Sequence, residues 1–119
     1  MVLRTKLDRL SDELDALVQK WAVTQRSYLS YQPAEVGHHY YGRRMELLRW
    51  DLLNIIPLTD EEHKLYHNGK ILIEIENPFR IMYLAQRAAM DYKQYLLENR
   101  LSKEEFMLQC KEKIERELK

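Results

Sequence analysis

The chain has 119 residues, and its 19 Lys and Arg residues equal its 19 Asp and Glu residues, so the formal net charge is zero. This length suits a single domain over residues 1 to 119, and the single cysteine, Cys110, excludes both an intramolecular disulfide and a zinc site built from a CxxC pair. The opening run MVLRTKLDRLSDELDALVQ lacks a signal-peptide core and no later run reaches membrane-spanning length, so we expect a cytoplasmic protein without membrane contact.

The charge balance bears on the class of partner. Many nucleic-acid-binding proteins carry a large positive field, which this chain as a whole lacks. The composition therefore argues against a nonspecific DNA coat, and a role on DNA has to come from local features.

An amphipathic helix is predicted at the start of the chain, over residues 3 to 25. Large apolar side chains recur there at alternating steps of four and three residues, which places them on one helix face: Leu3, Leu7, Leu10, Leu14, Leu17 and Trp21. Two interpretations of this seam remain open. It packs on the core of its own chain, or residues 3 to 21 form a coiled-coil contact in a homodimer.

Two short strands and a helix are predicted next. Residues 35 to 41 are rich in aromatic side chains and compatible with a strand, and the apolar run over residues 52 to 58 predicts a second one. Thr59 and Glu62 have the spacing of a capping box, which starts a helix near residue 60. The pair Asn68-Gly69 is a good left-handed terminator for that helix.

The remaining chain is predicted to contain one strand and two helices, the helices covering residues 78 to 119. Isoleucines alternate over residues 71 to 75, which indicates a half-buried strand. Asn77-Pro78 is expected to open a helix that extends to residue 99. Ser102 and Glu105 form another capping box, which starts the final helix.

All four histidines of the chain lie within residues 37 to 70. His63 and His67 are four residues apart on the predicted helix, so they project from one face and can hold a metal ion between them. His38 and His39 end the first predicted strand and point to opposite sides of it. One of this second pair can join the metal, while the other faces solvent as a base, for which the ordinary histidine pKa near 6.5 is well suited.

The pattern HH…N…HKLYH resembles the HNH nucleases, also called ββα-metal or His-Me finger nucleases, with a spacing similar to that of colicin-type DNases. The segment HHYYGRRMELLRWDLLN also resembles phage recombination endonucleases of the NinG/Rap type. The resemblance implies an α+β fold in which a small ββα-metal core, residues 35 to 69, has flanking N- and C-terminal helices. The cysteine pairs that usually brace such phage proteins are absent here, so we expect packing to brace the unit, through Trp50, Leu52, Ile55, Leu58 and Leu65.

The resemblance also implies roles for individual residues. His38, His63 and His67 are expected to bind one divalent metal ion, and His39 is expected to be the general base. Asn54 is expected to be catalytic, either by holding the His39 ring through a hydrogen bond or by approaching the metal. Zinc, nickel or manganese suits three imidazoles better than magnesium, which prefers oxygen ligands.

Three arginines of the same window are candidate DNA contacts. Arg43 and Arg44 follow the histidine pair in a predicted loop, where guanidinium groups can bind backbone phosphates. Arg49 has the same potential, but it can instead pair with Asp51 or Glu46. Asp51 is in turn a candidate acceptor for a histidine N–H, an arrangement that orients ligands in many metal sites.

The expected function is a metal-dependent DNA endonuclease that hydrolyses phosphodiester bonds in phage or prophage recombination, with branched DNA among its substrates. A second hypothesis is a non-catalytic DNA-binding or interaction module, in which structural zinc is held by four protein ligands, His39 or another side chain being the fourth. A third is a helical adaptor that acts through its leucine seam, so that loss of the histidines leaves partner binding intact.

Overall fold

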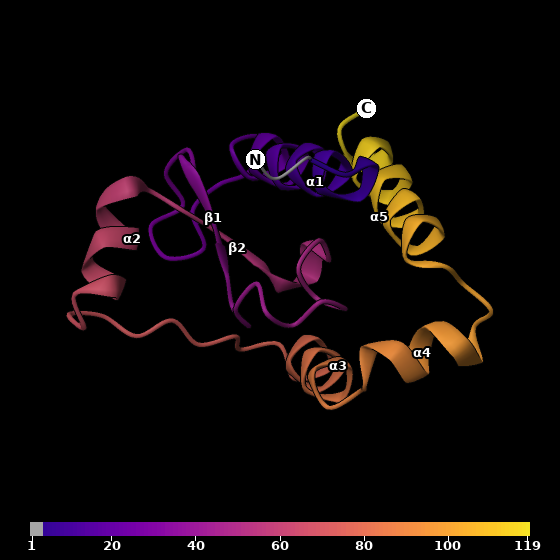
Figure 1. Ribbon diagram of the computed structural model, residues 1–119. Coiled ribbons are helices and arrows are strands. Elements are labelled where there is room, and N and C mark those ends of the chain that lie inside the picture. Colours follow the sequence, from indigo (N-terminus) through magenta and orange to yellow (C-terminus); the bar gives the residue numbers. More distant parts are fainter. Residues whose placement is uncertain (1–3) are drawn as a thin grey trace.

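A capping box starts the first helix. The computed structural model (Figure 1) describes residues 4–119, so Leu3 of the predicted seam lies outside the described residues. The Thr5 hydroxyl accepts a hydrogen bond from the Asp8 amide, the Asp8 carboxylate accepts one from the Thr5 amide, and helix α1 follows over Lys6–Ala22. The prediction of a helix here is confirmed.

Helix α1 packs against the C-terminal helix α5, Lys103–Glu117, which lies beside it in Figure 1. The apolar seam of α1 joins side chains of α5 in one core cluster, whose members include Leu10, Leu14, Phe106, Met107 and Ile114. The seam therefore packs on the core of its own chain, as the first interpretation predicts. A homodimer stays a prediction, and it would need a surface other than this covered seam.

The sheet is a two-stranded antiparallel hairpin. Strand β1, Val36–His39, pairs with strand β2, Ile55–Leu58, in a register that sets His38 opposite Ile56 and His39 opposite Ile55. Both strands are shorter than predicted, and in the second a 3-10 turn, Leu52–Asn54, occupies the predicted start. Together with five α-helices in residues 4–119, this sheet confirms the predicted α+β class.

Apolar clusters cover both faces of the hairpin. Ile55 points into the cluster of α1 and α5, whereas Ile56 and Leu58 point into a second cluster with Ile73, Ile75 and Leu84. This alternation follows from the pleat of a strand, in which neighbouring side chains face opposite sides. Of the predicted bracing residues, Trp50, Ile55 and Leu58 are buried, and Leu52 and Leu65 are half-buried.

The helix after the hairpin is confirmed with its capping box. Helix α2 spans Asp60–His67, the Thr59 hydroxyl accepts from the Glu62 amide, and the Glu62 carboxylate accepts from the Thr59 amide. Gly69 follows the helix with a φ of +70°, the left-handed conformation that favours glycine.

The predicted strand over residues 71 to 75 is wrong. The segment is not a strand, although Ile73 and Ile75 are buried and Leu72 is exposed. The alternation in the sequence records which side chains reach the second apolar cluster. It carries no information on whether another strand lies alongside to pair with this one.

The predicted helix over residues 78 to 99 is two helices. Helix α3, Pro78–Ala88, begins at Asn77 as expected, but the chain turns at Asp91, whose carboxylate accepts from the Gln94 amide and caps helix α4, Tyr92–Glu98. Helix α5 begins after Ser102, as predicted. Across the described part of the chain, no helix combines the length and the apolar character that crossing a membrane requires.

Gly37 in β1 is a point of close packing. A Cβ atom at this position would lie 2.8 Å from Ile55 Cγ2 and 2.9 Å from Ala22 Cβ, both in buried residues. We expect Gly37→Ala to lower the free energy of unfolding by about 1–3 kcal/mol, the usual range for overpacking. Gly42→Ala is the matched control, because a Cβ atom there meets nothing within 4 Å. Urea unfolding of both variants checks this, and equal stability of the two would contradict it.

Candidate metal centre

Three histidines converge from two elements. β1 supplies His38 and α2 supplies His63 and His67, and one ring nitrogen of each lies within 4.8 Å of the others. The Nε2 atoms of His63 and His67 are 2.9 Å apart. Two nitrogens bound to one tetrahedral zinc at the usual bond length lie about 3.3 Å apart, so the His63–His67 pair is already near the spacing that one ion requires. The structure thus brings the predicted ligand set together, whatever the identity of the metal.

The protonation of these rings favours metal binding. Burial, together with the charges of the neighbouring histidines, lowers the pKa of His38 to about 4. Burial also lowers the pKa of His63, with a contribution from His67. A histidine binds metal through its neutral ring, so the two imidazoles with lowered pKa values are ready to bind at neutral pH.

The three histidines open into a groove of about 520 Å³ that also exposes His39 and Arg43. Within residues 4–119, no fourth His, Cys, Asp or Glu joins the group that could hold the metal. Three protein ligands leave room on a tetrahedral ion for a ligand from solution, which is the pattern of catalytic rather than structural zinc sites. The groove therefore places a base candidate beside a metal site with an open position.

His39 has a defined tautomer in this structure. Its Nε2 atom lies 2.9 Å from the backbone oxygen of Arg49. A carbonyl oxygen only accepts, so Nε2 carries the proton and Nδ1 keeps a free lone pair. Burial lowers the pKa of His39, which outweighs the raising effect of the Arg49 carbonyl, and the ring is neutral at pH 7. His39 thus has what a general base requires.

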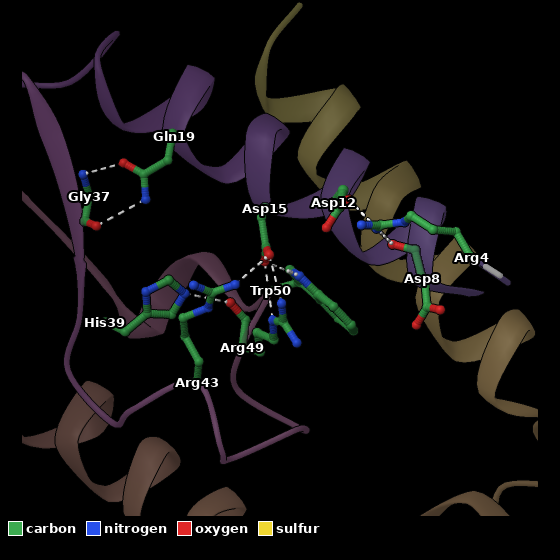
Figure 2. Close-up of polar contacts among 10 residues, drawn as sticks. All are labelled: Arg4, Asp8, Asp12, Asp15, Gln19, Gly37, His39, Arg43, Arg49 and Trp50. Carbon is green, nitrogen blue, oxygen red and sulfur yellow. Dashed lines mark hydrogen bonds and ion pairs between the residues drawn. The ribbon is translucent and has the colours of Figure 1, made fainter. Parts of the chain in front are cut away.

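Asp15 of α1 holds the segment that carries this carbonyl (Figure 2). Its carboxylate accepts hydrogen bonds from Arg49 Nε at 3.1 Å, Arg49 Nη2 at 2.6 Å and Trp50 Nε1 at 2.9 Å, and Arg43 Nη2 lies 2.7 Å away. Burial tends to raise the pKa of Asp15, but these donors and charges outweigh it and hold the pKa below its usual range. Asp15 is therefore ionised, and it links α1 to the loop that orients His39.

The predicted partners of Arg49 are wrong. Its guanidinium pairs with Asp15, not with Asp51 or Glu46, and lies over the Trp50 ring at 5.0 Å. Asp51 accepts hydrogen bonds from the Leu53 amide and the Tyr83 hydroxyl, and it does not orient a histidine.

The three candidate DNA-binding arginines are not equivalent. Arg43 lines the histidine groove, while Arg44 is exposed on a different hollow of about 350 Å³. Arg49 is half-buried in its pair with Asp15. Of the three, Arg43 is the one that shares a groove with the histidines.

Asn54 contacts neither the His39 ring nor the metal-binding nitrogens. Its fully buried amide oxygen accepts from the Tyr41 amide at 2.8 Å, and its nitrogen donates to the carbonyls of Tyr41 at 3.0 Å and Leu48 at 3.1 Å. Both predicted contacts are replaced by bonds to the backbone between residues 41 and 48. Asn54 thereby shapes the loop that brings the Arg49 carbonyl to His39.

Two positioning residues were missed by sequence reasoning, Asp15 and Gln19. The Gln19 side chain accepts from the Gly37 amide at 2.8 Å and donates to the Gly37 carbonyl at 3.0 Å, one residue before His38 (Figure 2). Both residues lie beside the apolar seam of α1. In the sequence, a polar residue there that contacts another segment has the same pattern as one exposed to solvent. No signal in the sequence marks them.

Comparison with known proteins adds no family to these observations. No protein-family model matches the chain, and comparisons with curated proteins and with solved structures also find no match. The function proposed below therefore depends on the site itself.

The geometry predicts one divalent ion per chain. We expect zinc or cobalt to bind the wild type and raise its free energy of unfolding by about 2.7 kcal/mol at a free metal concentration of 100 times Kd. His63→Ala removes one of three ligands and should weaken binding by about 100-fold, on the basis of about 3 kcal/mol per ligand. His39→Ala should bind like the wild type. Calorimetric titration measures the metal affinity of all three proteins. If His39→Ala binds the metal as weakly as His63→Ala, this ligand set is contradicted.

Proposed function

We propose that this protein is a metal-dependent DNA endonuclease of the HNH type, with β1, β2 and α2 as its ββα-metal core. The observation that carries the proposal is that His39, with Nδ1 free to accept a proton, opens into the same groove as the three metal-binding histidines. Hydrolysis of a phosphodiester requires this combination of a base and a cation in one place.

The chain supplies separate groups for the reaction. A bound divalent ion provides positive charge for the scissile phosphate and the leaving oxygen. His39 Nδ1 accepts the proton of the attacking water, and the Arg49 carbonyl keeps the ring in place and stabilises its positive charge afterwards. Arg43 lines the groove and can exchange Asp15 for a phosphate of the bound strand.

Branched DNA is the proposed substrate class, in phage or prophage recombination, on the basis of the motif resemblance. A chain with a formal net charge of zero has little general attraction to the DNA backbone, which is consistent with recognition of DNA by its shape. A four-way junction should then be cut faster than linear duplex at the same salt concentration.

The alternative of a structural zinc module is less well supported by the site. That hypothesis requires four protein ligands, and three come together among residues 4–119. His39, one candidate for the fourth, instead uses Nε2 to donate to the Arg49 carbonyl. The adaptor hypothesis requires an accessible leucine seam, but the seam packs in the core between α1 and α5.

The proposal is tested with protein stripped of metal and incubated with supercoiled, linear and four-way-junction DNA, while Mg, Mn, Ni and Zn are titrated separately. We expect the wild type to cut DNA only when metal is present, and His38→Ala to be inactive. Arg44→Ala should still cut, since Arg44 lies outside the histidine groove. If the wild type cuts none of these substrates with any metal but binds one zinc ion tightly, the endonuclease proposal fails and the zinc module is the better account.

A further inference from the structure

Another cavity, of about 730 Å³, lies apart from the histidine groove and shares none of its lining residues. Its walls come from α1, from the segment that precedes β2, and from helices α3, α4 and α5. Its volume falls within the range of small-molecule pockets in proteins, which is about 300–1,000 Å³. No step of the proposed cleavage reaction uses it.

The charge of this cavity is unbalanced. Four cationic side chains line it, Arg80, Arg87, Lys113 and Arg116, against the two carboxylates of Asp51 and Glu117. The ion pairs found within residues 4–119 include none of these four cations. Arg80 donates to the backbone carbonyls of Leu53 and Ile55, at 2.8 and 3.1 Å, which are neutral acceptors. The cavity thus has an excess of positive charge.

Arg87 is a cation of this wall whose side chain is held in place. Its guanidinium lies over the rings of Tyr83 and Tyr95, at 5.8 and 4.8 Å, which fixes its orientation. Its Nε atom is buried and, among the described residues, has no hydrogen-bond partner. Because Nε is buried, a ligand in the cavity does not reach it, and Arg87 contributes the positive charge of its guanidinium to the wall.

The walls also offer aromatic surface. Trp21, Trp50, Tyr83, Tyr95 and Phe106 line the cavity, and they include both tryptophans of the chain. Aromatic walls beside guanidinium groups suit a planar ring that carries an anion. A phosphate monoester fits the anionic part, because it has close to two negative charges and three strong acceptor oxygens.

We propose that this cavity binds a small organic phosphate with a planar aromatic body, of the nucleoside monophosphate class. The phosphate lies among the cations of α3 and α5. The base packs on the aromatic wall. This site is independent of the proposed nuclease centre and goes beyond its function.

The test is an NMR titration of the full chain with adenosine 5′-monophosphate, in the presence of a chelator so that no metal is available to bind the phosphate. We expect saturable shifts of the two indole N–H signals and of Arg87 Nε–H. Adenosine and inorganic phosphate, titrated separately, should each bind at least tenfold more weakly. Shifts from inorganic phosphate at the same affinity would overturn the aromatic part of the proposal.

Charge-matched variants locate the ligand. Lys113→Glu and Arg116→Glu change exposed residues that line the cavity, and each should weaken binding of the nucleotide by about tenfold. Lys20→Glu makes the same change of net charge outside both hollows and should leave the affinity unchanged. Equal weakening by all three variants would overturn the proposal, as would the absence of saturable binding.

His38→Ala separates this proposal from the nuclease. The variant lacks a metal ligand of the histidine groove and should bind the nucleotide like the wild type. If His38→Ala loses nucleotide binding while Lys113→Glu keeps it, the phosphate binds in the histidine groove and the second site is refuted. If the wild type binds the nucleotide but cuts no DNA with any metal, the nuclease proposal fails and the nucleotide site stands.

Discussion

Replacement of His39 by alanine is expected to lower the rate of DNA cleavage by about 100- to 10,000-fold, the usual contribution of a general base, and to leave metal binding intact. The reason is that Nδ1 is the free nitrogen of a ring whose Nε2 atom is held by the Arg49 carbonyl. Single-turnover cleavage of supercoiled plasmid, with the metal that activates the wild type, measures the effect. His38→Ala is the contrasting variant, because it should lose the metal and the activity together.

Added imidazole distinguishes a missing base from a disturbed fold. A free imidazole molecule can enter the space left by the side chain in His39→Ala and accept the proton, so partial recovery of the rate is expected. His38→Ala should not recover in the same solution. A His39→Ala protein that cuts at the wild-type rate would exclude His39 as the base and leave the metal centre without an identified partner.

Asp15→Ala is expected to lower the free energy of unfolding by about 2–4 kcal/mol. Its carboxylate is the common acceptor for Arg49 and Trp50, so its loss leaves a half-buried guanidinium and a buried indole N–H without their acceptor. The rate of DNA cleavage should fall as well, because the same contacts hold the segment that orients His39. Urea unfolding and plasmid cleavage measure the two effects.

Asp12→Ala provides the control on the same helix. Asp12 pairs with Arg4 at the surface, where an ion pair contributes less than about 1 kcal/mol. The pKa of Asp15 is held below its usual range, so its contribution is present above about pH 4 and is lost as the pH falls further. The difference in stability between wild type and Asp15→Ala should therefore shrink in acid. If Asp12→Ala and Asp15→Ala lower the free energy of unfolding equally, the contacts of Asp15 with Arg49 and Trp50 do not stabilise the fold.

Local chemistry explains which elements were predictable. Helices α2 and α5 begin where Thr59 and Ser102 have a glutamate three residues later, and each capping box forms as expected. Such a signal involves neighbouring residues and short-range hydrogen bonds, so a single sequence contains all of it. The histidine pair on α2 was predictable for the same reason, since its spacing matches one helical turn.

The errors arise where distant segments decide the outcome. Ile73 and Ile75 alternate like strand residues, yet what they contact is an apolar cluster and not a partner strand. Asp91 starts a new helix within a run of good helix formers, where a capping aspartate looks like a surface residue. Asp15 and Gln19 act on segments 18 to 35 positions away in the chain, and that distance hides their role.

The Gly37–Pro57 pair has a consequence for how this hairpin behaves toward other chains. Strand edges recruit further strands through free N–H and C=O groups, and that is a common route to aggregation. Gly37 lies opposite Pro57, and the Gln19 side-chain amide forms hydrogen bonds with both the N–H and the C=O of Gly37. On the other strand, the Tyr28 amide donates to the Pro57 carbonyl at 2.9 Å, and proline has no N–H. Both outer edges are thus closed at this pair, and the smallest possible sheet is protected from growing.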